Sequence, residues 1–129
     1  MKSVLRNFAF GILLAPLPLL AATPSPPGAR EYFISPKDGA TVHGPVTVRF
    51  GLKGMGVAPA GIQKDTTGHH HLLIDTDLPP LDQPIPNDEH HKHFGAGQTQ
   101  TTLDLPPGKH TLQLLLGDFA HVPHQPPVM

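Results

Sequence analysis

The sequence contains no cysteine and no tryptophan, and it has a single tyrosine among its 129 residues. Without cysteine the chain has no disulfide to stabilise it and no thiolate to offer a metal ion. Any metal site must therefore use histidine, carboxylate, methionine or backbone ligands. Covalent hydrolysis is also disfavoured, because the only serines beyond the N-terminal segment are Ser25, in a proline-rich stretch, and Ser35, at the end of an expected strand.

Basic charge is scarce as well. Nine Lys and Arg residues stand against ten Asp and Glu residues. Two of the nine, Lys2 and Arg6, lie in the N-terminal segment, so seven (9 − 2) remain for the rest of the chain. Nucleic acids and anionic membranes are bound by clusters of Lys and Arg. The composition therefore predicts neither as a partner.

Residues 1–22 have the pattern of a secretory signal: a positive start, an apolar run and small residues at its end. The run is short for a membrane span and is interrupted by Pro16 and Pro18. We expect cleavage and a periplasmic or secreted protein, with an uncleaved N-terminal anchor as the alternative. Residues 23–29 are proline-rich and predict an extended tether, and residues 30–129 predict one domain.

Beyond the signal no helical periodicity of 3.6 residues is present. Apolar and polar residues alternate instead in short segments separated by Pro and Gly, which predicts strands over residues 31–35, 45–51, 70–75, 101–105 and 109–116. This spacing is typical of an all-β, immunoglobulin-like antiparallel β-sandwich. Such a sandwich has about seven strands, and no closing strand is visible over residues 126–129. We therefore expect the last strand to be missing and one sheet edge to be unpaired.

Ten histidines are present, and their spacing carries more information than their number. Residues i and i+2 of a strand point to the same side, about 7 Å apart, so two such imidazoles can reach one ion. Pairs with this relation occur in two segments, and a third pair brackets a proline near the C-terminus. The candidate metal ligands are His69, His71, His91, His93, His121 and His124.

The other histidines are assigned differently. His70 shares a strand face with Leu72 and Ile74, so it is either a core residue or a further ligand. His43 and His110 are expected at the surface, and His90 is expected to be a solvated neighbour of the ligands. Three carboxylates are candidate acceptors for the free N–H of a ligating imidazole, with loop solubility as the alternative: Asp75, Asp88 and Glu89.

A site made of imidazoles without thiolate suits Cu(II), Zn(II) or Ni(II). Met55 or Met129 would add a soft ligand and favour copper, so we expect Cu(II) first and Zn(II) second. Because only the neutral imidazole binds a metal, binding should weaken as the pH falls through about 6.5.

Four segments together resemble one bacterial family, catalogued as domain of unknown function 4399. They cover residues 31–40, 68–75, 93–99 and 110–118. The resemblance implies an exported single domain and supplies no established activity. Its pattern takes in His69, His70, His71, His91, His93, His110, His121 and His124. His90 is additional to that pattern, and Lys92 occupies a position where an apolar residue is usual.

Three functions remain open from the sequence. The first is a periplasmic metal-binding module, acting as a carrier, buffer or resistance factor and exchanging its ion with a metal-handling protein. The second is a structural or interaction domain whose histidines hold loops together by hydrogen bonds. The third is a metal-dependent enzyme, which would need an open coordination position and Asp88 or Glu89 as a base.

Overall fold

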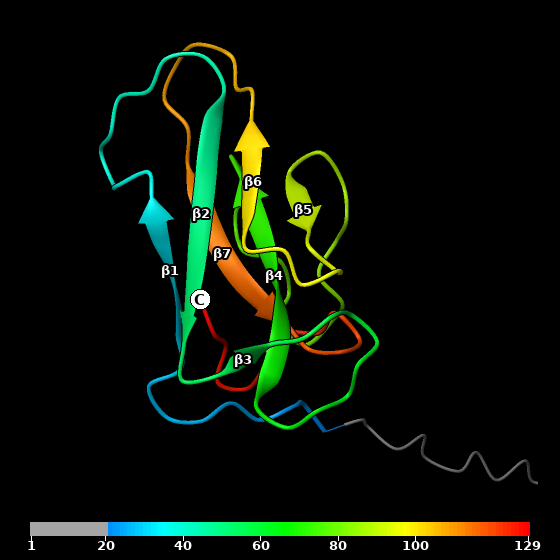
Figure 1. Ribbon diagram of the computed structural model, residues 1–129. Coiled ribbons are helices and arrows are strands. Elements are labelled where there is room, and N and C mark those ends of the chain that lie inside the picture. The colour runs from blue at the N-terminus through cyan, green and yellow to red at the C-terminus, as the bar shows by residue number, and fades with distance from the viewer. Residues whose placement is uncertain (1–20) are drawn as a thin grey trace, which may run out of the picture.

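The computed structural model describes residues 21–129, so nearly all of the predicted signal segment, residues 1–22, lies outside the described residues. Within residues 21–129 the chain forms two packed β-sheets (Figure 1). This part of the chain contains no helix that is long and apolar enough to cross a membrane.

The first sheet contains three antiparallel strands in the order β1 (Arg30–Ser35), β2 (Val46–Lys53) and β6 (Gln100–Leu103). The second is organised around β4 (Thr67–Ile74), which pairs with β3 (Gly56–Val57), β5 (His91–His93) and β7 (Leu112–Gly117). Leu72 of β4 faces partners in both β5 and β7, so these two strands flank β4 on opposite edges.

The predicted all-β sandwich is confirmed, although two of its seven strands were not expected. β3 has two residues and β5 has three, and segments this short show no alternation that a pattern could detect. β4 begins at Thr67, three residues before the expected start, so all three consecutive histidines lie within one strand.

The main core lies between the two sheets and is built from Val48, Phe50, Leu72, Ile74, Phe94, Leu103 and Leu114. His70 points into this layer, as the alternation along β4 predicted. Its ring packs edge-on against Phe50 and its Nδ1 atom hydrogen bonds to the Glu31 carboxyl of β1. Burial raises the pKa of Glu31 and lowers that of His70, so both shifts favour the uncharged forms of the two side chains. His70 is therefore a core residue that links the two sheets.

No strand follows β7 in the described residues, but the edge expected to be unpaired is covered. The Leu116 amide donates to the Val128 carbonyl at 2.9 Å, and Val128 is fully buried. The proposed tether, residues 23–29, also differs from a free spacer, because Pro24 pairs with Gln125 in a parallel bridge. Prolines lack the N–H needed for a regular strand, which explains why neither segment was recognised as part of the fold.

Candidate metal centre

The outer face of the second sheet carries three histidines that touch one another. His69 and His71 point to this face because they alternate with core-facing His70 along β4. His93 of β5 lies directly opposite His71 in the antiparallel register. Cross-strand partners on one face have closely spaced side chains, and the ring centroids are 4.7 Å apart for His69–His71, 5.1 Å for His71–His93 and 5.0 Å for His69–His93.

A fourth imidazole reaches the cluster from the loop after β7. The ring centroid of His121 is 4.7 Å from that of His93, 5.0 Å from that of His69 and 6.1 Å from that of His71. His121 has a positive φ of 69°, a conformation that non-glycine residues adopt rarely and at a cost. Four rings from three segments therefore converge, and we refer to them as the histidine cluster.

The spacing of the ring nitrogens is close to that of a metal site. One ligand nitrogen from each of His69, His71 and His93 can be chosen so that all three lie within 4.8 Å of one another. Two ligands about 2.1 Å from one ion in a tetrahedral site are about 3.4 Å apart. The widest pair would therefore have to close by up to about 1.4 Å (4.8 − 3.4) when an ion binds.

Five ring nitrogens of the cluster are buried without a hydrogen-bond partner in the protein. Neither ring nitrogen of His69 or of His71 hydrogen bonds within the protein, and the same holds for Nε2 of His93, although all five atoms are buried. A buried polar atom without a partner costs about 1–3 kcal/mol. Nitrogen lone pairs that are buried, unpaired and convergent are what a metal ion would satisfy.

Burial also keeps these rings in the form that binds metal. Desolvation, reinforced by repulsion from His121 and His93, lowers the pKa of His69 to about 4. Desolvation and repulsion from the neighbouring rings lower the pKa of His71 to about 3, and burial lowers that of His93 as well. These values correct the expected titration near 6.5 for His69 and His71, which are neutral at neutral pH.

Two glycines leave room for the rings. A Cβ atom on Gly117, the β7 partner of His69, would lie 2.6 Å from Cε1 of His71. A Cβ atom on Gly95 would collide with the ring of His93. Side chains at these positions would have to displace the imidazoles, so both glycines define the shape of the cluster.

Asp118, which the sequence did not single out, organises the loop that carries His121. Its buried carboxylate accepts hydrogen bonds through Oδ1 from the amides of Ala120 and Val122, at 2.8 and 3.0 Å. The His121 amide donates to the Asp118 carbonyl at 2.9 Å. An Asp that bonds amides two and four residues ahead is a turn signal that could have been read from the sequence.

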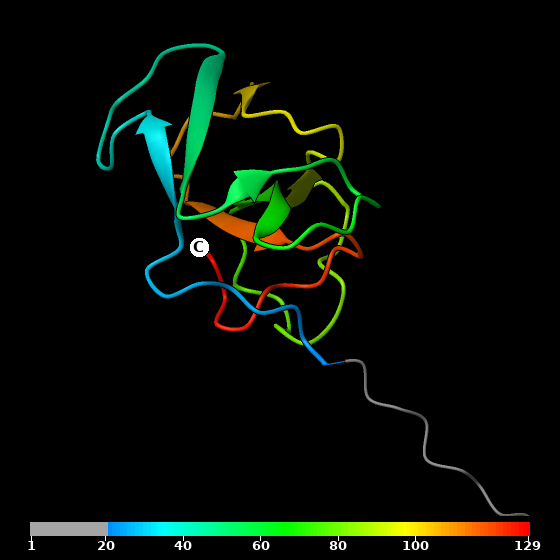
Figure 2. The same cartoon turned by 60° about the horizontal axis from the view of Figure 1, so that its bottom comes forward.

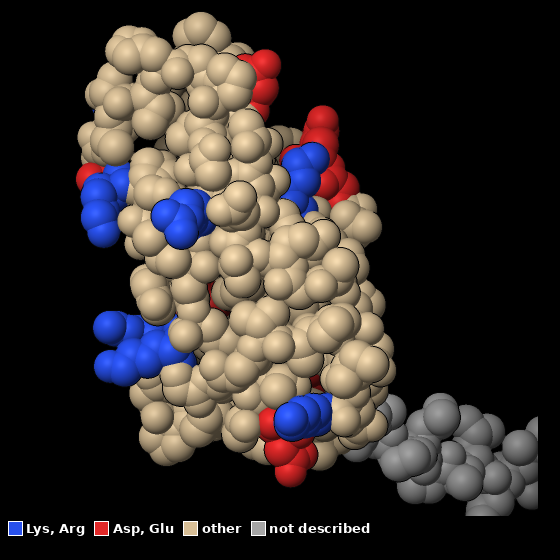
Figure 3. All heavy atoms as spheres, in the orientation of Figure 1, with Lys and Arg blue, Asp and Glu red and all other residues tan. Residues whose placement is uncertain are grey.

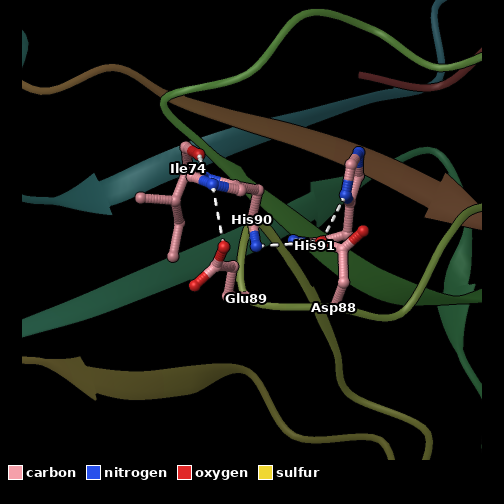
Figure 4. Close-up of polar contacts among 5 residues, drawn as sticks. All are labelled: Ile74, Asp88, Glu89, His90 and His91. Carbon is pink, nitrogen blue, oxygen red and sulfur yellow. Dashed lines mark hydrogen bonds and ion pairs between the residues drawn. The ribbon is translucent and has the colours of Figure 1, made fainter.

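Two of the six candidate ligands lie outside the cluster. His91 shares the outer face of the sheet, but its Nδ1–H donates to Asp88 Oδ1 at 2.7 Å (Figure 4). The ring of His124 is buried elsewhere, where its Nε2–H donates to the Thr67 carbonyl at 3.1 Å. The i, i+2 relation predicted that His91 and His93 would both be ligands, but only His93 belongs to the cluster. Of His121 and His124, only His121 does.

Two histidines that were not expected to be ligands, His90 and His110, form hydrogen bonds within the protein. His90 Nδ1 bonds the Ile74 carbonyl at 2.9 Å, and Glu89 lies 3.5 Å from its other ring nitrogen (Figure 4). His110 donates to Asp75 at 2.7 Å and to the Pro106 carbonyl at 2.7 Å, and the hydrogen bond to Asp75 raises its pKa. The three carboxylates expected to support ligands therefore pair instead with His110, His91 and His90.

No curated protein and no solved structure matches the chain. A family model does match, over residues 48–129, which is more than half of the sequence. The matched segment contains every residue of the histidine cluster and the loop around Asp118. The chain therefore belongs to the family described as Domain of unknown function (DUF4399).

Proposed function

We propose that this protein binds one transition-metal ion through His69, His71 and His93, with His121 as a fourth ligand. The observation that carries the proposal is the convergence of buried ring nitrogens that have no protein partner. Their lowered pKa values add to it, because neutral imidazoles need not lose a proton before they coordinate.

The donor set favours Cu(II), with Zn(II) second. Imidazole suits both ions, and a given nitrogen site usually binds Cu(II) more tightly than Zn(II). With the N-terminal signal pattern, the proposal is an exported, periplasmic carrier, buffer or resistance factor. It would exchange its ion with another periplasmic metal-handling protein.

An enzymatic role has less support. Asp88 and Glu89, the carboxylates considered as bases, are engaged with His91 and His90. Asp118 lies next to the cluster, but its oxygens accept hydrogen bonds from the loop amides and from Thr23. Among the described residues, these three carboxylates are therefore already paired with other groups of the protein.

Titration of the purified protein with Cu(II) and Zn(II) tests the proposal. We expect one ion per chain, a d–d absorption band with copper, and a rise in melting temperature. Binding should stabilise the fold by about 2.7 kcal/mol at a free metal concentration of one hundred times the dissociation constant. His93→Gln should lose most of this effect, whereas His43→Gln, in an exposed loop, should keep it.

A structural role for the histidines is the second candidate. It is favoured by three histidines that bond other parts of the protein: His91 bonds the Asp88 carboxylate, His90 bonds the Ile74 carbonyl at the end of β4, and His110 bonds the Asp75 carboxylate. Under this alternative the melting temperature would not respond to either metal. His93→Gln and His110→Gln would then change stability without any difference in metal binding.

A further inference from the structure

The N-terminal segment is fastened to the part of the chain that carries His121. Figure 2 shows the two ends running side by side beneath the sandwich, the N-terminal stretch in blue and the C-terminal stretch in red. The Gln125 amide donates to the Thr23 carbonyl at 2.9 Å, and the Ser25 amide donates to the Gln125 carbonyl at 3.2 Å. Thr23 is thereby held beside the loop of residues 118–122.

One side-chain contact connects this segment to the histidine cluster. The Thr23 hydroxyl donates to Asp118 Oδ2 at 2.6 Å across 95 positions of sequence. The other oxygen of the same carboxylate holds the amides of Ala120 and Val122, on either side of His121. Hydrogen bonds to a charged acceptor are stronger than neutral ones, so Thr23 supports the carboxylate that sets the loop conformation.

His121 depends on that loop more than the other three rings do. His69, His71 and His93 are placed by strand register, whereas His121 is placed by a turn with a positive φ. Two amides outside the loop also hold it: that of Ile85 donates to the His121 carbonyl and that of Gly61 donates to the Phe119 carbonyl, each at 2.9 Å.

We propose that Thr23 and Asp118 are positioning residues for His121, so that the N-terminal segment acts as a latch on the metal site. When the Thr23–Asp118 hydrogen bond is made, His121 is held against the other rings and the ion is retained. When it opens, His121 swings away and the ion exchanges. The retention of metal rests on the proposed function; the positioning of the loop does not.

The test compares Thr23→Val, which keeps the shape but removes the hydroxyl, with Thr23→Ser, which keeps the hydroxyl. Ser25→Ala is a matched control, because the Ser25 hydroxyl bonds the Pro126 carbonyl and not Asp118. The first measurement is hydrogen–deuterium exchange of the Val122 amide in the metal-free full chain. The second is the rate at which EDTA removes Cu(II) from the loaded chain.

We expect Thr23→Val to raise both the Val122 exchange rate and the copper release rate about tenfold, the effect of losing one hydrogen bond to a charged group. Thr23→Ser and Ser25→Ala should stay within about twofold of the wild type on the same scale. Equal exchange in Thr23→Val and the wild type would overturn the latch even if copper binds. If the Val122 amide exchanges faster in Thr23→Val but the protein binds no copper, the positioning role stands and the proposed function is refuted.

Discussion

The metal-free protein should lose stability in mild acid, because His69 and His71 are buried in the neutral form. Their pKa values are about 4 and about 3 in the folded protein, whereas an imidazole in the unfolded chain has a pKa of about 6.5. Between these values the unfolded chain binds protons that the folded chain does not. The free energy of unfolding therefore falls as the pH falls.

The expected loss is large for a domain of this size. At pH 5 each ring lowers the free energy of unfolding by about 2 kcal/mol, so the two together remove about 4 kcal/mol. Small domains have about 5–15 kcal/mol in total. His70 and His93, whose pKa values burial also lowers, act in the same direction. Glu31, whose pKa burial raises, opposes this loss of stability in acid. His110, whose pKa is raised by its hydrogen bond to Asp75, acts in the opposite direction.

Urea denaturation at pH 7.5, 6.0 and 5.0, with EDTA present, measures this dependence. The His69→Gln/His71→Gln double variant should lose the part of the pH dependence that these two rings contribute, about 4 kcal/mol at pH 5, since glutamine does not titrate, whereas the contributions of His70 and His93 should remain. His43→Gln should behave like the wild type. Two results would show that these rings are not buried as described. One is a free energy of unfolding that does not change from pH 7.5 to pH 5.0. The other is a double variant whose free energy of unfolding depends on pH as strongly as that of the wild type.

Three further changes separate the cluster from the rest of the fold. Gly117→Ala should weaken Cu(II) binding about tenfold or more by displacing the His71 ring. Gly56→Ala, whose Cβ would meet only Thr67 at 3.6 Å, should leave the affinity unchanged. Isothermal titration calorimetry measures the affinity of both variants. Leu72→Ala should cost about 2–5 kcal/mol of stability in urea denaturation by opening a cavity in the core, and a cost under 1 kcal/mol would contradict the packing. Asp88→Ala should release His91 and leave the metal stoichiometry unchanged, so loss of metal binding would place His91 in the site.

The sequence pattern was sufficient for the faces of β4. Alternation with a period of two separated His69 and His71 from His70, Leu72 and Ile74, and the structure has this arrangement. The same rule could not select between later pairs, because the orientation of His93 depends on its register with His71 in a three-residue strand. Pairing of that kind is determined by tertiary contacts, which no local pattern contains.

The conformation of the loops could not be predicted from the sequence pattern, for a related reason. The position of His121 follows from the turn that Asp118 builds and from the Thr23 hydroxyl at the other end of the chain. The carboxylates near histidines in sequence, Asp88 and Glu89, drew attention instead, and they bond their own neighbours. Proximity along the chain was a poor guide to which carboxylate serves the cluster.

X-ray absorption at the metal edge of the copper- or zinc-loaded protein tests the central claim most directly, because it counts the imidazoles bound to the ion. We expect three or four nitrogen ligands at about 2.0–2.1 Å, with at least one lost in His93→Gln. A first shell of oxygen atoms, or a nitrogen count unchanged by His93→Gln, would contradict it.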